Sequence, residues 1–342
     1  MKTAAAFRFA SARTANRLVA GVPAAARLAR AFAEARAPGP LVLVLEEGGA
    51  LDPLTRDEIA RLAPHVTVQL HEDPHMEAIP AEALPDAATI TALLAGRAPL
   101  LPPPADADAA LHRAGRQIIR ATAKPGDGIV SRHLNRPLSQ AASALLLRFS
   151  WVRPGHATAL TAAIALAMFA CLVSGTLAGL VAGAVLFQLA SVADGIDGEI
   201  ARATFRTSAR GAAWDSAVDA ATNLGFLAGV IANLWLRSET IPALIGGAGL
   251  AALTLGMGLL GFHARARGEP LHFDGAKRML GERESALTRW LRYLTMRDFY
   301  CLFLAVMIAL GLVTAALAIF AAAAAGWLAT VIALLWRART PA

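Results

Sequence analysis

Six long apolar stretches in the second half of the chain restrict its fold more than any other feature. They cover residues 157–174, 176–193, 212–235, 240–262, 299–317 and 319–336. Each is near the length that crosses the hydrocarbon core of a bilayer, and a segment in that core forms a helix because its backbone groups must be hydrogen-bonded internally. The third stretch contains Asp215 and Asp219 near its start. We therefore expect a mainly α-helical integral membrane protein with six transmembrane helices.

Charge is distributed unevenly along the chain. Residues 1–123 contain 13 Lys/Arg and 13 Asp/Glu, so the net charge of +7 lies in the hydrophobic part. Basic residues gather in the predicted loops 203–211 and 263–298, and because such loops usually face the cytoplasm, both are placed there together with the N-terminus. The expected location is a bacterial inner membrane. The basic tracts and stacking aromatic residues of nucleic-acid binders are missing, so nucleic acid is not an expected partner.

The chain divides into three predicted regions. Residues 1–105 are expected to form a small cytoplasmic α/β domain that ends near the proline run Pro102–Pro104, where a linker begins. Residues 106–155 are assigned to this linker and to an amphipathic helix that lies on the membrane surface. Residues 156–342 are predicted to form the six-helix membrane domain that carries catalysis.

The small domain is predicted from an alternation of short apolar runs and helix-forming segments. Strands are expected at 41–45 and 66–70 and helices at 54–63 and 87–95, which is the pattern of β-α-β units. The Ala/Arg-rich segment 4–36 is interpreted as helix.

Four aspartates and their small neighbours form the most informative chemical pattern. Asp194 and Asp197 lie three residues apart, and Asp215 and Asp219 lie four apart, so each pair shares one face of a helix. If the two helices pack side by side, the four carboxylates converge and require cations. Hard oxygen ligands favour Mg²⁺ or Mn²⁺, and two such ions would hold a diphosphate whose oxygens Arg202 contacts. Carboxylates at the edge of a membrane span usually mark a function.

Two interpretations without catalysis stand beside this one. The aspartates are helix-end charges facing water, or they form the cation site of a non-catalytic membrane protein such as a transporter. Neither interpretation needs Arg202 or the small residues Gly198, Ala201 and Gly211 in register with the aspartates.

The spacing D-x-x-D-G-x-x-A-R-x8-G-x-x-x-D-x-x-x-D, which begins at Asp194 and ends at Asp219, resembles the signature of the CDP-alcohol phosphotransferase (CDP-alcohol phosphatidyltransferase) family. This resemblance implies a six-helix core that forms a homodimer and an active site with two divalent ions. The residue roles that it implies are metal ligands at Asp194, Asp197, Asp215 and Asp219, the general base at Asp219, and a nucleotide pocket lined by Gly198, Ala201, Arg202 and Gly211. The run from Arg153 to Thr158 looks like the family's entry into the first span, which adds Thr158 to the nucleotide pocket.

The implied reaction is the displacement of CMP from a CDP-alcohol by the hydroxyl of an acceptor, in phospholipid biosynthesis. CDP-diacylglycerol is the expected donor, since an opening between helices would admit acyl chains. The alternative is a soluble CDP-alcohol, as in inositol-phosphate joining or aminoalcohol transfer. Arg210, Lys277 and Arg297 are candidates to bind the acceptor, and positive-inside charges are the alternative for each.

The segment from Lys124 to Pro137 looks similar to the juncture in archaeal-type members, where a cytidylyltransferase domain precedes the transferase. Those members join inositol phosphate units. The N-terminal domain of this chain lacks the glycine-rich, arginine-containing nucleotide loop after its first strand. We therefore expect a degenerate nucleotidyltransferase-like domain, or an unrelated one, without catalytic activity.

Overall fold

The computed structural model of the chain describes residues 6–71, 73, 76–99, 102–266 and 296–337. It contains two compact units. The first comprises Met1–Lys124, Gln140–Pro154 and Gly198–Thr207, and the second comprises Pro125–Ser139, Gly155–Asp197 and Ser208–Ala342.

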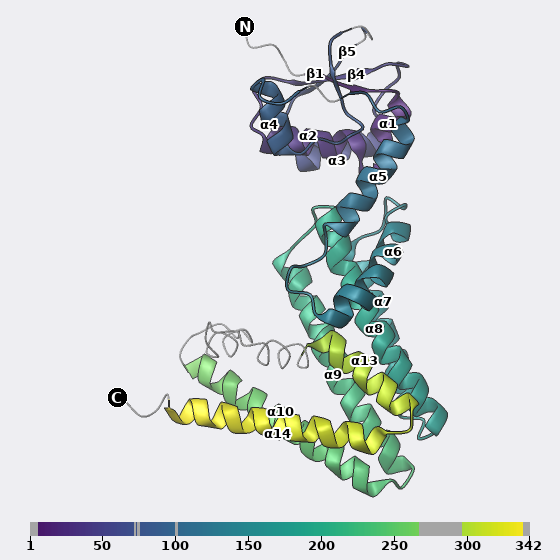
Figure 1. Ribbon diagram of the computed structural model, residues 1–342, viewed down its shortest axis with the longest axis vertical. Coiled ribbons are helices and arrows are strands. Elements are labelled where there is room, and N and C mark those ends of the chain that lie inside the picture. The colour runs from purple at the N-terminus through teal and green to yellow at the C-terminus, as the bar shows by residue number, and fades with distance from the viewer. Residues whose placement is uncertain (1–5, 72, 74–75, 100–101, 267–295, 338–342) are drawn as a thin grey trace. The chain divides into compact units, whose positions relative to one another are not determined.

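The first unit is built on a four-stranded sheet with strand order β5-β4-β1-β6, in which every neighbouring pair is parallel. Its strands are β1 (Ala6–Phe9), β4 (Leu41–Leu45), β5 (Val68–His71) and β6 (Ile79–Pro80), and its helices are α1 (Ala12–Asn16), α2 (Ala24–Glu34), α3 (Pro53–Leu62), α4 (Ala87–Leu94) and α5 (Ala107–Arg120). Helices α2 and α3 lie along one face of the sheet (Figure 1). The core between them includes an edge-to-face contact of Phe7 with Phe32.

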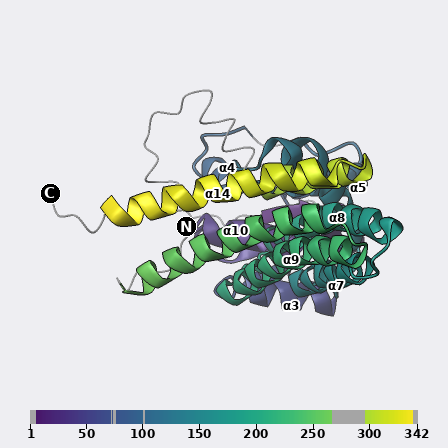
Figure 2. The ribbon, with the colours of Figure 1, turned by 90° about the horizontal axis from the view of Figure 1, so that it is seen from below.

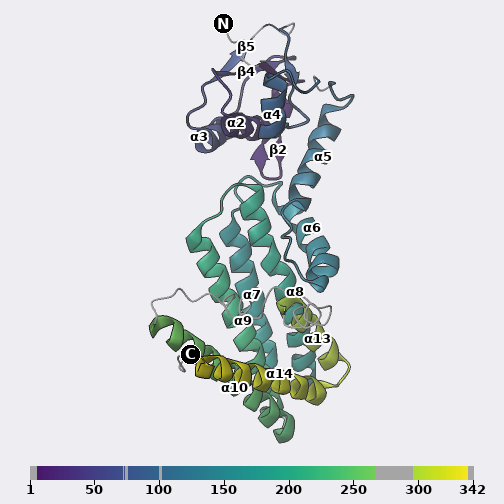
Figure 3. The same ribbon diagram turned by 60° about the vertical axis from the view of Figure 1, so that its left-hand side comes forward.

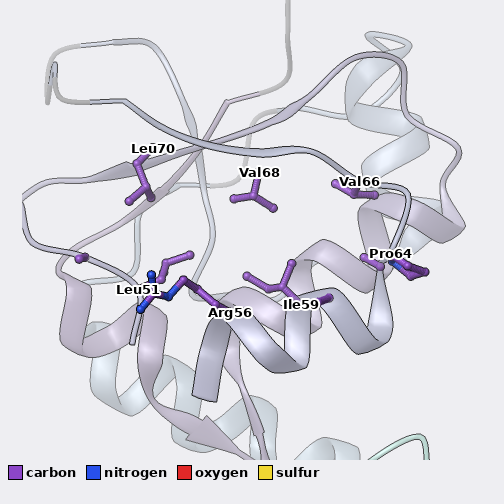
Figure 4. A pocket seen from close by; sticks show the side chains of 10 residues that line it. Leu51, Arg56, Ile59, Pro64, Val66, Val68 and Leu70 are labelled. Atoms are coloured by element: carbon purple, nitrogen blue, oxygen red, sulfur yellow. The ribbon is translucent and has the colours of Figure 1, made fainter. Parts of the chain in front are cut away.

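Local sequence explains where α3 begins and what lies against it. The Asp52 side chain accepts the backbone N–H of Thr55 at 2.6 Å, and Pro53 occupies the first helical position, where its missing N–H costs nothing. A pocket between α3 and β5 is lined by apolar residues such as Ile59 and Val68, together with the exposed Arg56 (Figure 4).

The prediction of one helix over 4–36 is wrong. This segment holds β1, α1, an antiparallel hairpin of β2 (Leu18–Val19) with β3 (Val22–Pro23), and α2. Two consecutive residues with positive φ, Ala20 and Gly21, form the turn of that hairpin. Helix propensity is overridden because burial of the Phe7 and Phe9 side chains favours a strand. The other predicted strands and helices of this domain are confirmed to within two residues.

The second unit is helical. It contains the π-helical turn η1 (Ser131–Asn135), most of α8 (Leu177–Ala203), and the helices α7 (Pro154–Leu172), α9 (Ala209–Leu236), α10 (Thr240–Ala266), α13 (Arg297–Ala309) and α14 (Val313–Arg337). Helix α6 (Arg136–Leu146) is divided between the two units, and the last turns of α8, from Gly198, belong to the first. Helices α10 and α14 lie side by side, as Figures 2 and 3 show from two directions.

Five helices in the described part of the chain are long and apolar enough to cross a membrane, namely α7, α8, α9, α10 and α14. The six predicted spans are therefore confirmed only in part. The predicted fifth span, 299–317, is not one continuous helix, because α13 ends at Ala309. Gly311 has φ +76°, and the N–H groups of Gly311 and Leu312 bond back to the carbonyls of Ile308 and Met307, a Schellman motif that ends the helix.

Candidate active site

Three aspartate side chains converge between α8 and α9. Carboxylate oxygens of Asp194, on α8, and of Asp215 and Asp219, on α9, all lie within 4.8 Å of one another. Phe187 on α8 and Phe226 on α9 also hold the two helices together, because their rings stack with their centroids 3.8 Å apart. Each ring lies seven residues, or two helical turns, from the nearest of these aspartates in sequence. The stack thus fixes the register that brings the carboxylates together.

Arg297, the first residue of α13, forms ion pairs with two of these carboxylates. Its Nη1 donates to Asp194 Oδ2 at 3.0 Å and also to Asp219 Oδ1. Its Nε and Nη2 are buried and have no partner among the described residues. A buried guanidinium donor without an acceptor is costly, so this side chain is suited to bind a further anionic group.

The start of α13 is fixed by the next residue. Asp298 Oδ2 accepts the backbone N–H of Ser131 at 2.5 Å, which attaches α13 to the turn η1. Gly128 lies against the same carboxylate, because a Cβ at this position would be 2.5 Å from Asp298 Oδ2. The segment before α6 therefore helps to place Arg297 at the aspartates.

The fourth predicted metal ligand, Asp197, is not part of the cluster of three. Its Oδ2 accepts a hydrogen bond of 2.7 Å from Thr158 Oγ1 on α7, and the residue is buried. Three residues on a helix correspond to about 300°, so the side chains of Asp194 and Asp197 leave α8 about 60° apart. The structure thus brings the predicted nucleotide-pocket residue Thr158 to the motif, whereas a metal-ligand role for Asp197 stays a prediction.

Arg136 is a neighbour of the motif that the sequence did not single out. It forms a two-point pair with Asp127, from Nε to Oδ2 at 2.8 Å and from Nη2 to Oδ1 at 3.0 Å. A Cβ built on Gly195 would lie 3.1 Å from Arg136 Nη1 and 3.2 Å from Ser139 Oγ, so a glycine at this position permits the close approach. A sequence signal for Arg136 was present, because segment 124–137 resembles one branch of the family. The resemblance assigned no roles to individual residues of that segment.

The remaining predicted residues are placed individually. Gly198, Ala201 and Arg202 lie on the last two turns of α8, and Arg202 Nε donates to the carbonyl of Thr122 at 2.9 Å. Gly211 lies in the first turn of α9, where its N–H donates to the N-cap Ser208 Oγ at 3.0 Å. Arg210 is exposed in the same turn. Lys277 lies outside the described residues.

The donor set fits a divalent metal ion. Asp194, Asp215 and Asp219 offer hard carboxylate oxygens close enough together to share an ion, and such ligands suit Mg²⁺ or Mn²⁺. When the three carboxylates are ionised, their negative charges outnumber the positive charge of Arg297. A bound cation would therefore reduce the repulsion that remains.

Comparison with known proteins adds an independent finding. Residues 151–336, more than half of the chain, match the family described as CDP-alcohol phosphatidyltransferase. Three curated relatives carry the name "Bifunctional IPC transferase and DIPP synthase". The relative from Thermococcus kodakarensis is 43% identical over 120 residues, which cover 34% of this chain and 26% of the relative. The relative from Archaeoglobus fulgidus is 37% identical over 133 residues, which cover 38% of this chain and 26% of the relative. The relative from Aquifex aeolicus is 35% identical over 134 residues, which cover 39% of this chain and 30% of the relative. The matched part spans less than a third of each relative's length.

Proposed function

Since this chain belongs to the CDP-alcohol phosphatidyltransferase family, we propose that its aspartate cluster transfers a substituted phosphate group from a CDP-alcohol to an acceptor alcohol and releases CMP. The observation that carries this proposal is the convergence of Asp194, Asp215 and Asp219 with Arg297 across them. The cluster provides carboxylates for ions and a base, and Arg297 provides donors for an anion.

In the proposed reaction, the Asp219 carboxylate accepts the proton of the acceptor hydroxyl. The acceptor oxygen then forms a bond to the β-phosphorus of the donor. The bond from that phosphorus to the oxygen bridging the two phosphorus atoms breaks, and its electron pair leaves with CMP. One or two divalent ions held by the aspartates, when bound, would neutralise the negative charge of the diphosphate.

Arg297 is the proposed contact for the phosphate of the acceptor. Two of its nitrogens have no partner among the described residues, and phosphate oxygens are the acceptors that a guanidinium binds best. Thr158 and Asp197, which share a hydrogen bond, are proposed to contact the nucleotide. Gly198, Ala201, Arg202 and Gly211 keep the nucleotide-binding roles that the family motif implies. Arg210 and Lys277 stay candidates for acceptor binding.

The donor is proposed to be a soluble CDP-alcohol of the inositol-phosphate-joining type. Support comes from the names of the curated relatives, which are IPC transferases and DIPP synthases. The contact of Arg136 with Gly195 adds to it, because Arg136 belongs to the segment that resembles this branch of the family. These findings favour a soluble donor over CDP-diacylglycerol, which the sequence alone had favoured.

The proposed setting is a bacterial inner membrane with the aspartate cluster and the N-terminal domain in the cytoplasm. Its support is the excess of Lys and Arg in loops 203–211 and 263–298. A homodimer formed through the membrane domain follows from the family resemblance and belongs to the same proposal.

A donor panel tests the choice of substrate. Purified full-length protein in lipid nanodiscs is incubated with Mg²⁺ or Mn²⁺, an inositol phosphate acceptor, and either CDP-inositol or CDP-diacylglycerol. We expect CMP release with CDP-inositol that depends on the acceptor and disappears in Asp219→Asn. Glu239→Gln is the matched control, because Glu239 is an acid paired with Arg237 beyond the other end of α9. CMP release with CDP-diacylglycerol but not with CDP-inositol would overturn the proposed choice of donor. If neither donor gave CMP although the protein binds metal, a non-catalytic cation site would be favoured.

A further inference from the structure

The N-terminal α/β unit binds the backbone carbonyls at the C-terminal end of α8. Arg27 Nη2 donates to the carbonyl of Ala203 at 2.6 Å, and Arg61 donates to those of Thr204 at 3.0 Å and Phe205 at 3.3 Å. The last carbonyls of a helix have no partner inside the helix and carry partial negative charge. Two arginines from α2 and α3 thus satisfy the end of the helix that carries the family motif.

Phe205 holds an unusual position at this helix end. Its N–H and that of Arg206 bond back to the carbonyls of Arg202 and Ala201, which forms a Schellman motif with Phe205 in the place that glycine usually occupies. Its φ is +56°, a conformation that costs free energy for a bulky residue. The strain is offset by the guanidinium groups of Arg30 and Arg27, which lie 3.8 and 5.3 Å from the centre of the ring.

A shared carboxylate completes the contact. Glu58, which is buried on α3, accepts hydrogen bonds of 2.5 Å from both Arg61 and Arg206. Arg206 follows directly after Phe205, so the same loop is held by its backbone, by its ring and by an ion pair. Three kinds of interaction therefore converge on residues 203–206.

Burial of the Arg27 guanidinium removes its charge from water, which costs free energy that specific contacts offset. Burial, and next the neighbouring Arg30, lower the pKa of Arg27 to about 9, so the group is still charged at neutral pH. Its other donors bind the carbonyls of Val19 at 2.7 Å and Ala20 at 2.9 Å. The buried guanidinium thus donates to three backbone carbonyls, one of which belongs to α8.

The crevice where an α/β sheet usually binds a ligand is occupied in this domain. The crevice lies at the carboxyl ends of the strands, where backbone N–H groups receive phosphates. Here the N–H of Ala10, directly after β1, donates to Glu82 Oε1 at 2.6 Å, and Glu82 is buried. A buried carboxylate at this amide disfavours an anionic ligand, so the contact with α8 is the better candidate for what the domain does.

We propose that the N-terminal domain is a clamp that positions the last turns of α8, and with them Arg202, for nucleotide recognition. Its positioning residues are Arg27, Arg61 and Phe205. The clamp also includes the carbonyl of Thr122, after α5, which accepts Arg202 Nε at 2.9 Å. The part of this inference that concerns the nucleotide rests on the proposed function, whereas the clamp itself does not.

Two measurements on the full-length protein test the clamp. Hydrogen exchange reports the opening of residues 198–206, and calorimetric titration reports the affinities for CMP and for Mn²⁺. In Arg27→Ala and Arg61→Ala we expect exchange of this segment to rise about tenfold and CMP affinity to fall about tenfold, as for the loss of one charge-assisted hydrogen bond. Affinity for Mn²⁺ is expected to be unchanged. Arg56→Ala is the matched control, because Arg56 lies on α3 with Arg61 but lines the exposed pocket of Figure 4.

Phe205→Gly separates positioning from simple helix capping. Glycine is the favoured residue at this place, so a purely structural role predicts equal or higher thermal stability and unchanged CMP affinity. The clamp predicts weaker CMP binding, because the ring between the arginines is lost, and it predicts recovery in Phe205→Tyr, which keeps the ring.

Each result decides one part of the inference. Unchanged exchange in both arginine variants would overturn the clamp, and raised exchange with unchanged CMP affinity would overturn its role in nucleotide recognition. A wild-type protein that does not bind CMP at all would instead count against the proposed function. In that case the exchange measurement still decides whether the clamp exists.

Discussion

Replacing Arg297 with glutamine is expected to strengthen metal binding while it weakens acceptor binding. The Nη1 group of Arg297 donates to Asp194 at 3.0 Å and also to Asp219, so an incoming cation must compete for the same oxygens. Charge-assisted hydrogen bonds contribute about 1.5–3 kcal/mol each. The three side chains are 17%, 25% and 29% exposed, so solvent screening reduces this contribution. We therefore take about 1.5 kcal/mol as the free energy that a metal ion must spend to displace Arg297. Removing this cost corresponds to about a tenfold gain in metal affinity.

The assay is titration of Mn²⁺ into purified protein without nucleotide, followed by electron paramagnetic resonance. Arg297→Lys is the matched control, because it keeps the positive charge and is expected to bind Mn²⁺ as the wild type does. In the same Arg297→Gln protein, the KM for a phosphorylated acceptor is expected to rise relative to the wild type. The KM for the CDP-alcohol donor is expected to rise less. Unchanged or weaker Mn²⁺ binding in a folded Arg297→Gln protein would refute the competition between guanidinium and metal.

Three further outcomes follow from the site. Thr158→Val removes the hydroxyl that donates to Asp197 at 2.7 Å and is expected to lower kcat/KM about fivefold, the equivalent of about 1 kcal/mol, while Thr158→Ser keeps the rate. Gly195→Ala places a Cβ 3.1 Å from Arg136 Nη1; it is expected to lower the rate of CMP release by displacing that group, with little change in Tm because alanine favours helix. Removal of divalent ions with EDTA is expected to abolish CMP release, and Mg²⁺ or Mn²⁺ to restore it.

The convergence of Asp194, Asp215 and Asp219 was predictable, because helical periodicity and apolar length are local properties of the sequence. The spacing places Asp215 and Asp219 on one face, and the long apolar stretches make α8 and α9 neighbours joined by a short loop. The hydrogen bond from Thr158 to Asp197 was not predictable in the same way, because it depends on how α7 packs against α8.

The parts that were not predicted depend on tertiary contacts. The helical interpretation of 4–36 failed because alanine-rich composition indicates helix wherever it occurs, whereas Phe7 lies in a buried strand. The end of α13 is set by the backbone of Gly311, which divides an otherwise continuous apolar stretch. Phe205 at positive φ has no sequence signal, because only the arginines of a distant segment make that conformation tolerable.

The central claim is that the aspartate cluster transfers a phosphate-containing group from a CDP-alcohol, and acceptor-dependent release of CMP tests it most directly. Release is measured with purified protein, Mg²⁺, CDP-inositol and an inositol phosphate, in the wild type and in Asp219→Asn. The account predicts CMP formation equal to the acceptor consumed, and loss of both in the variant although its cluster still binds metal. Equal rates of CMP formation in the two proteins, or CMP formation without any acceptor consumed, would contradict it.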